Sequence, residues 1–144
     1  ITSSGTTAGT MISGGFRIVT GTNIYLTGSF TATLGLVSGS VTDTWYYERI
    51  GNAVTINTAA NKSFTKDGTT SAVTITGAPA GILPTTTVAC TPVLLNYNNA
   101  SVPMVNLHAT TTGFSLYRSA AEDAFGANVA NNLFLRTTFS YIVR

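Results

Sequence analysis

The sequence predicts an all-β domain, an antiparallel β-sandwich of the jelly-roll-like kind, and three observations lead to this prediction. Thr, Val, Ile, Tyr and Phe are abundant, and β-branched and aromatic side chains pack well on a pleated sheet. Turn residues recur about every ten positions, which is typical of a sandwich or barrel of short strands. Helix signals are nearly absent. Because 44% of the 144 residues are hydrophobic, the chain can build a real core, and we expect one domain over residues 16–144.

The first residues differ in composition from the rest. Residues 1–15, ITSSGTTAGTMISGG, are small, polar and rich in glycine, which predicts a linker or the end of a thin stalk. The chain begins at Ile1 without an initiator methionine, so we expect an upstream part. Residues 16–26 are predicted to hold one or two short strands around Gly21.

The segment WYYERIGNAVTI, residues 45–56, predicts a β-hairpin closed by the two-residue turn Gly51-Asn52. Side chains alternate between the two faces of a strand. The apolar face, expected in the core, carries Trp45, Tyr47, Val54 and Ile56, and the polar face carries Tyr46, Glu48, Thr55 and Asn57. Tyr46 is then the outward aromatic residue. It either covers the sheet surface or contacts a subunit or a ligand.

The other strands are predicted from the same alternation of apolar and polar residues. Pro92 is placed at an edge or a bulge, because proline cannot donate to a β ladder. Residues 77–84 are predicted to form a loop fixed by Pro79 and Pro84. The predicted strands are 29–37 with Phe30, Ala32 and Leu34 inward, 71–76 with Val73 and Ile75 inward, 85–97, 102–108, 114–118, and 133–144 with Leu133, Leu135, Phe139, Tyr141 and Val143 inward.

Residues 119–132, SAAEDAFGANVANN, break the β pattern. Ser119 and Glu122 have the spacing of a helix capping box, and Gly126 is suited to end a short helix. We therefore predict a surface loop with one short helix, inserted before the final strand.

Charge and cysteine content exclude several classes of protein. The net charge is only +2 and the basic residues form no run, so we expect no nucleic-acid partner. No apolar stretch approaches the roughly 18 residues needed to span a bilayer, so we expect no membrane insertion. Cys90 is the single cysteine, which precludes an intrachain disulfide and predicts a buried, inert thiol.

Catalytic patterns are missing, and we expect a protein that is not an enzyme. His108 is the single histidine and is interpreted as a structural strand residue. No nucleophile elbow, phosphate loop or metal-ligand spacing appears, so no catalytic residue, metal or cofactor is predicted. The five acids, Asp43, Glu48, Asp67, Glu122 and Asp123, show no pairing typical of glycoside cleavage.

Three segments carry a resemblance to a known family. GSFTATL, then WYYERIGNAVTI, then AVTITGAPAGILP, is similar to a pattern in C-terminal β domains of tailed-phage tail fibres and other virion appendage proteins. In those proteins a G-T-F-T-A-T-L start leads to a Y-x-R-x-G-N-x-V-T-L hairpin and then to F-x-L-x-G-L-P-A-x-I-x-P. The matching positions here are Phe30 to Leu34, Tyr47, Arg49, Gly51, Asn52, Val54, Thr55, Ile56, Gly77, Pro79, Ala80, Ile82 and Pro84. The resemblance covers residues 28–84, and it implies that the matching positions are scaffold, a hairpin and a proline-fixed loop. Arg49 is expected to pair with an acid of its own or a neighbouring subunit.

The resemblance implies a virion structural protein that forms a homotrimer, joined to an upstream fibre shaft or other virion proteins. We expect a distal tail-fibre head domain that recognises a glycan or protein on the host surface, because a rigid β scaffold presents polar loops for recognition. The candidate receptor contacts are Asn98, Asn99, Glu122, Asp123 and Phe125 on loops, with Tyr46 on a sheet face. Two alternatives stay open: a structural domain of a head fibre, decoration or tail-tip protein, and a carbohydrate-binding module of a larger enzyme.

Overall fold

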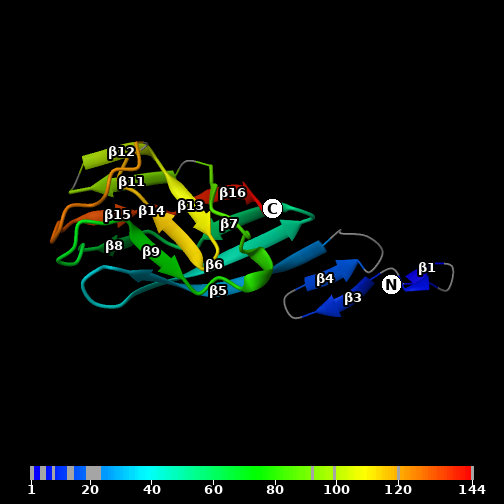
Figure 1. Cartoon of the computed structure of the whole chain (residues 1–144). Helices are drawn as coiled ribbons and strands as arrows, with labels where there is room; N and C mark the ends of the chain where they lie inside the picture. The colour runs from blue at the N-terminus through cyan, green and yellow to red at the C-terminus, as the bar shows by residue number, and fades with distance from the viewer. Residues whose placement is uncertain are drawn as a thin grey trace.

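The computed structural model describes residues 2–143, except 4, 5, 8, 13, 14, 19–23, 92, 99 and 120. Every pair of neighbouring strands in the described part is antiparallel, so the predicted all-β, antiparallel domain is confirmed. Besides the two-stranded pair of β1 and β2, the strands form one large and one small sheet, which pack together at one end of the molecule (Figure 1).

The large sheet curls until its two outer strands meet. Thr91, just after one outer strand, donates its N–H to the carbonyl of Ser140 in the other at 2.9 Å. The sheet is therefore nearly closed, and its inner face encloses most of the core. In order across the sheet the strands are β10 (Val88–Ala89), β13 (Leu107–Thr110), β14 (Gly113–Leu116), β9 (Val73–Thr76), β5 (Ile24–Gly35), β6 (Val41–Ile50), β7 (Ala53–Thr58) and β16 (Thr138–Ile142).

The N-terminal strands extend from one end of the large sheet (Figure 1). β3 (Gly9–Ile12) and β4 (Gly15–Ile18) form a hairpin, and β4 pairs with the start of β5. Before them, β1 (Thr2–Ser3) pairs with β2 (Thr6–Thr7). The assignment of residues 1–15 to a linker or stalk stays a prediction, and Gly21 lies outside the described residues.

The small sheet covers the opposite end of the molecule. Three of its strands precede the loop at residues 121–131 in the sequence, and one follows it. In order they are β12 (Ala100–Val105), β11 (Val93–Tyr97), β15 (Asn132–Phe134) and β8 (Lys62–Phe64).

Three segments predicted as single strands are each divided between the two sheets. Segment 85–97 contains β10 and β11, segment 102–108 contains parts of β12 and β13, and segment 133–144 contains β15 and β16. In the last of these the bend at 135–137 changes which residues face inward: Phe134 is buried in β15, whereas Leu133 is half-buried. Strands that switch sheets at a bend make the corners of such folds. Pro92, predicted at an edge or bulge, lies outside the described residues.

The central hairpin follows its prediction closely. Ile50 pairs with Ala53 across the turn, and the register continues as expected to Tyr46 and Asn57. Gly51 has φ +58°, a left-handed conformation that glycine adopts without steric cost. The four residues predicted for the inner face are all buried, namely Trp45, Tyr47, Val54 and Ile56.

Trp45 lies at the centre of the core and is fully buried. Its ring stacks against Phe134 of the small sheet at 5.7 Å between centroids. Three further rings from the large sheet surround it, at centroid distances of 5.6 to 5.9 Å: Phe30, Phe114 and Phe139. Because Trp45 contacts aromatic residues of both sheets, it joins the two layers.

Two loops differ from what the sequence predicts. The described part of 119–132 contains no helix. Instead, the short helix of the described part is a 3-10 turn, η1 (Ala80–Ile82), inside the proline-fixed loop 77–84.

Arg49 does not pair with an acid among the described residues. Its guanidinium donates to the carbonyls of Gly51 and Gly81 and so connects the hairpin to the loop 77–84. No described helix has the length and hydropathy to span a bilayer.

Candidate functional site

Three loops gather at the end of the molecule opposite β3 and β4, and we call them the tip (Figure 1). They are residues 36–40 between β5 and β6, residues 65–72 between β8 and β9, and residues 121–131 before β15. Backbone hydrogen bonds join them: Ser38 N–H to Thr65 O at 2.9 Å, and Lys66 N–H to Val129 O at 2.9 Å. The tip therefore forms one connected frame of loops.

A buried lysine fastens this frame from within. Lys66 has no exposed surface, and its Nζ donates to the carbonyl of Leu36 at 2.7 Å, to Oγ1 of Thr69 at 3.0 Å and to the carboxylate of Asp67. Burying a charge is costly unless it is paired and hydrogen-bonded, and these three acceptors meet that need. The hydrogen bond from Lys66, with others from Thr69, lowers the pKa of Asp67 to about 2.

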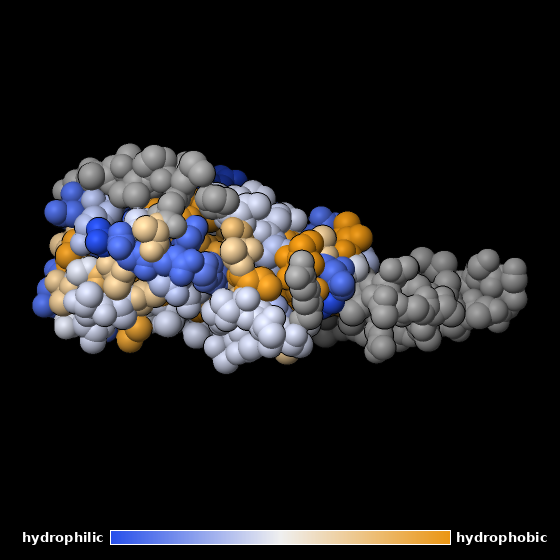
Figure 2. Space-filling model, turned by 45° about the horizontal axis from the view of Figure 1, so that its top comes forward, coloured by the Kyte–Doolittle hydropathy of each residue, from blue (hydrophilic) through white to orange (hydrophobic). Residues whose placement is uncertain are grey.

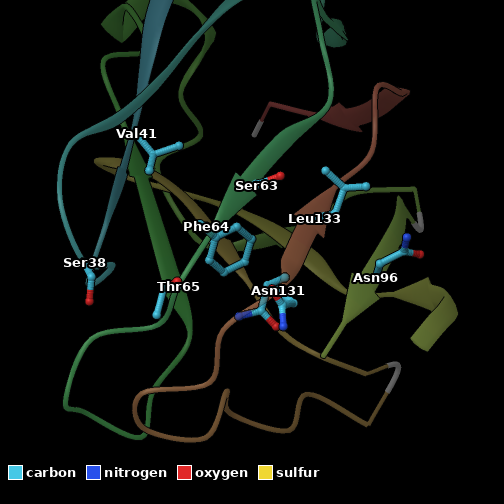
Figure 3. Close-up of a pocket in the computed structure, with 9 residues that line it drawn as sticks. Ser38, Val41, Ser63, Phe64, Thr65, Asn96, Asn131 and Leu133 are labelled. Atoms are coloured by element: carbon cyan, nitrogen blue, oxygen red, sulfur yellow. The ribbon is translucent and has the colours of Figure 1, made fainter. Parts of the chain in front are cut away.

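A polar hollow opens beside the tip, and we call it the tip pocket (Figure 3). Its volume is about 440 Å³, within the roughly 300–1,000 Å³ range of small-molecule sites. Most of its lining carries hydroxyl or carboxamide groups, which both donate and accept hydrogen bonds. These polar residues are Ser38, Ser63, Thr65, Asn96, Asn131 and Asn132.

The strand register explains how part of this lining converges. Ser63 of β8 lies directly across from Leu133 of β15, and Leu133 lies across from Asn96 of β11. The three residues form a row across neighbouring strands of the small sheet. The remaining apolar lining comes from Val41 and Phe64. Figure 3 shows the Phe64 ring amid the labelled polar side chains.

Among the predicted contacts, Asn98 lies next to this pocket. It occupies the turn between β11 and β12 with φ +49°, and its N–H donates to Oδ1 of Asn132 at 3.3 Å. Asn132 is fully buried and its Nδ2 donates to Val129 O at 2.7 Å. The buried Asn132 thus positions the turn and the loop on either side of the pocket. Asn99 lies outside the described residues.

Glu122 and Asp123 are exposed on the loop 121–131, but their carboxylates already have partners. Glu122 lies 3.3 Å from Nε2 of His108, and Asp123 lies 3.6 Å from the Arg118 guanidinium. Ser119, predicted to cap a helix, instead accepts the N–H of Asp123 at 3.3 Å and donates to its carboxylate at 2.8 Å. These contacts account for the loop conformation in place of a helix.

Phe125 does not reach the surface, so the structure removes it from the candidate contacts. Its side chain is fully buried, and its ring lies 5.6 Å from Phe64 and 5.8 Å from Tyr97. Its N–H also donates to Ser71 O at 3.1 Å, which fixes the loop to the body of the domain. Phe125 contributes to the site indirectly, because it supports the Phe64 ring that lines the tip pocket.

Tyr46 lies away from the tip, on the outer face of the large sheet, and is 52% exposed. It borders a second hollow of about 490 Å³ together with Glu48 and Asn57. In the same area, a hydrogen bond to Glu48 raises the pKa of Tyr25. The structure therefore distributes the predicted contacts over three places instead of gathering them in one.

The described residues contain no group of three His, Cys, Asp or Glu side chains placed to hold a metal ion. Burial raises the pKa of the Cys90 thiol to about 12, which suppresses the reactive thiolate. The arrangement at the tip pocket is suited to hydrogen-bonded recognition.

No protein-family model matches the chain, and no curated protein is significantly similar to it.

The tip pocket was not predicted from the sequence. Its lining joins residues 38, 41, 63–65, 96 and 131–133, which lie far apart along the chain. The signal that was available is the Asn-Asn pair at 131–132, next to an apolar run, because asparagine favours the left-handed backbone of tight loops. Asn131 adopts this conformation, with φ +57°.

Proposed function

We propose that the chain is the distal head domain of a phage tail fibre or similar virion appendage, and that it attaches to a receptor on the host surface through its tip. The observation that carries this proposal is the position of the tip pocket. The pocket lies at the end opposite β3 and β4, so an attachment through the N-terminal strands leaves it accessible. Binding residues on loops held by a rigid scaffold are the usual arrangement for recognition.

The fixed frame of the tip supports recognition by a preformed surface. Lys66, Phe125 and Asn132 are each fully buried, and each holds one of the tip loops in place. A binding surface that is ordered before the ligand arrives loses less conformational entropy on binding. The scaffold character of the segments similar to phage proteins agrees with this division between body and tip.

The proposal includes assembly into a homotrimer, with subunits in contact through the outer face of the large sheet. Four residues lie in one row across neighbouring strands: Tyr25 opposite Ile50, Ile50 opposite Ala53, and Ala53 opposite Ile142. Ile50 is 61% exposed and Ile142 is 47% exposed. The coloured surface in Figure 2 is mostly of intermediate to hydrophilic hydropathy, with several separate apolar patches. An apolar row exposed on a sheet face is typical of a surface that contacts another protein.

The experiment that tests the function is binding to cells. The purified chain, labelled with a fluorophore, is incubated with a panel of bacterial strains. We expect saturable binding to at least one strain, and we expect excess unlabelled chain to reduce adsorption of phages that infect that strain. A chain that binds none of the strains and leaves adsorption unchanged contradicts the receptor role.

The exposed apolar row also favours a second candidate, a structural domain that holds the particle together without touching a receptor. Sedimentation equilibrium, combined with the cell-binding experiment, distinguishes the receptor role from the structural role and tests the trimer itself. We expect a trimer for the chain and a monomer for the double variant Ile50→Lys with Ile142→Lys. Thr31→Lys, on the same sheet face, serves as the matched control. A trimer that binds no cell supports the structural role, and a monomer in all three cases contradicts the assembly.

A further inference from the structure

The tip pocket carries information about the chemical class of its ligand, and the inference drawn from it rests on the proposed receptor function. Ser63 and Thr65 bring hydroxyl groups, and Asn131 brings a carboxamide, so donors and acceptors are mixed around the hollow. A ligand that matches them must also mix donors and acceptors closely on a small surface. Sugar hydroxyl groups have this property, because each one both donates and accepts.

The apolar part of the lining adds a second requirement. Val41 and Leu133, both half-buried, contribute apolar surface between the polar groups, and Phe64, only 4% exposed, lies beneath them. Phe64 is held by the buried Phe125, whose ring lies 5.6 Å away in an edge-to-face arrangement. A pyranose ring presents C–H groups on one face and hydroxyl groups around its edge, which matches an apolar surface surrounded by hydroxyls and amides. A small anion has no apolar face of this kind.

The charges near the pocket decide between neutral and anionic sugars. The lining drawn from the described residues includes no charged side chain. The nearest lysines in the sequence are already paired: Lys62 lies 3.6 Å from Asp43, and Lys66 is buried against Asp67. A sugar carboxylate or phosphate bound here would lose water without gaining a cation, which is unfavourable. A neutral sugar has no such cost.

We propose that the tip pocket binds a neutral saccharide, with Ser63, Thr65 and Asn131 hydrogen-bonding its hydroxyl groups and the half-buried side chains of Val41 and Leu133 lying against its apolar face. The ligand is a glycan unit without carboxylate or phosphate, and it forms part of the receptor that the head domain recognises.

The test is a titration of the isotope-labelled 144-residue chain followed by amide NMR. The neutral probes are methyl glycosides of glucose, galactose, mannose, rhamnose and N-acetylglucosamine; the anionic probes are glucuronate and N-acetylneuraminate. We expect at least one neutral probe to shift the amides of Ser38, Ser63, Thr65 and Asn131, with a Kd of about millimolar order for a single sugar unit. We expect the anionic probes to bind at least about tenfold more weakly.

Two variants test whether the pocket itself binds the probe. Ser63→Tyr fills the hollow and is expected to abolish the shifts, whereas Thr65→Val removes one hydroxyl with little change of shape and is expected to raise Kd several-fold. Thr31→Val makes the same chemical change on the outer face of the large sheet and is expected to leave Kd unchanged. Thr65→Val keeps the test valid if Ser63→Tyr does not fold. Equal Kd values for wild type, Thr65→Val and Thr31→Val overturn the assignment.

The outcomes separate this inference from the proposed function. Absence of shifts with every neutral probe at about 50 mM, or stronger binding of the anionic probes, contradicts the inference. If the chain then still binds cells, and periodate oxidation of the cell-surface sugars leaves that binding unchanged, the receptor function stands with a different ligand. If neutral sugars shift the pocket amides but the chain binds no cells, the pocket assignment stands and the receptor function fails.

Discussion

The indole N–H of Trp45 donates to the buried carboxylate of Asp43 at 3.2 Å, so the largest core side chain is fastened to an acid two residues away on the same face of β6. Lys62 of β8 lies 3.6 Å from the other carboxylate oxygen. One acid therefore satisfies a polar group in the core of the large sheet and joins that sheet to the small one.

Asp43→Ala leaves the Trp45 indole N–H buried without a partner. We expect the free energy of unfolding to fall by about 1–3 kcal/mol, the usual cost of an unsatisfied buried donor. Urea denaturation measures the change. Asp43→Asn is the matched control, because its amide oxygen still accepts from the indole while the pairing with Lys62 is weakened. Equal losses for the two variants would show that the indole hydrogen bond contributes little.

Lys66→Met removes the cation that holds the tip loops. We expect a loss of about 2–3 kcal/mol in unfolding free energy, because the Leu36 carbonyl and the Asp67 carboxylate lose their donor. Lys62→Met makes the same change at a lysine whose side chain is 32% exposed, and it should cost less than about 1 kcal/mol. Chemical denaturation of both variants gives the comparison, and similar losses would contradict a special role for Lys66.

Asp67 makes the tip sensitive to acid. Its folded-state pKa of about 2 lies below the ordinary value of 3.8, so its contribution is present above about pH 4 and is lost as the pH falls toward 2. We expect thermal unfolding measurements from pH 5 to 2 to show a fall in Tm that is shallower in Asp67→Asn. Parallel curves for the two proteins over this interval would rule out Asp67 as the source.

Gly77 cannot carry a side chain. Its φ is +104°, and an added Cβ would lie 2.1 Å from the carbonyl oxygen of Thr31. Gly77→Ala is therefore expected to lose more than about 2 kcal/mol of unfolding free energy, since backbone strain and a steric clash add together. Gly39 also has a positive φ, +79°, but has open space around it. Gly39→Ala should cost about 1 kcal/mol, and an equal cost at both glycines would exclude the clash as the cause.

Cys90 is expected to resist thiol reagents while the chain is folded. Burial raises the pKa of its thiol to about 12, and only 9% of the residue is exposed. Incubation with 5,5′-dithiobis(2-nitrobenzoate) at pH 8 should give almost no colour, and full reaction should follow in guanidinium chloride. Rapid reaction of the folded chain would mean that the strand end near Cys90 opens readily.

The hairpin at 45–56 could be predicted to the residue because two independent signals agree there. The Gly51-Asn52 turn fixes the register, and alternation of apolar and polar residues fixes the face. The division of segment 133–144 between two sheets could not be predicted in this way. Apolar residues occupy odd positions on both sides of the bend, as Leu133 and Leu135 before it and Phe139 after it, so alternation alone predicts one continuous strand. It does not show that Phe134 belongs to the small sheet and Phe139 to the large one.

The candidate contacts show the same difference between local and long-range information. Tyr46 was predicted to face outward, and it does, because its face follows from alternation within one strand. The burial of Phe125 was missed, because it depends on contacts with Phe64 and Tyr97, which belong to other strands. The tip pocket was missed for the same reason, since its lining converges only when β8, β11 and β15 pair.

The pairing of β7 with β16 gives the domain a late step in its biosynthesis. Thr55 of β7 lies opposite Ser140 of β16, so β7 can form this pairing only after 85 further residues have been synthesised. Until β16 leaves the ribosome, one edge of β7 stays unpaired and Phe139 cannot cover Trp45. A nascent chain stalled before residue 138 would expose an adhesive edge, so productive folding should depend on the prompt emergence of residues 138–142 or on a chaperone that covers this edge.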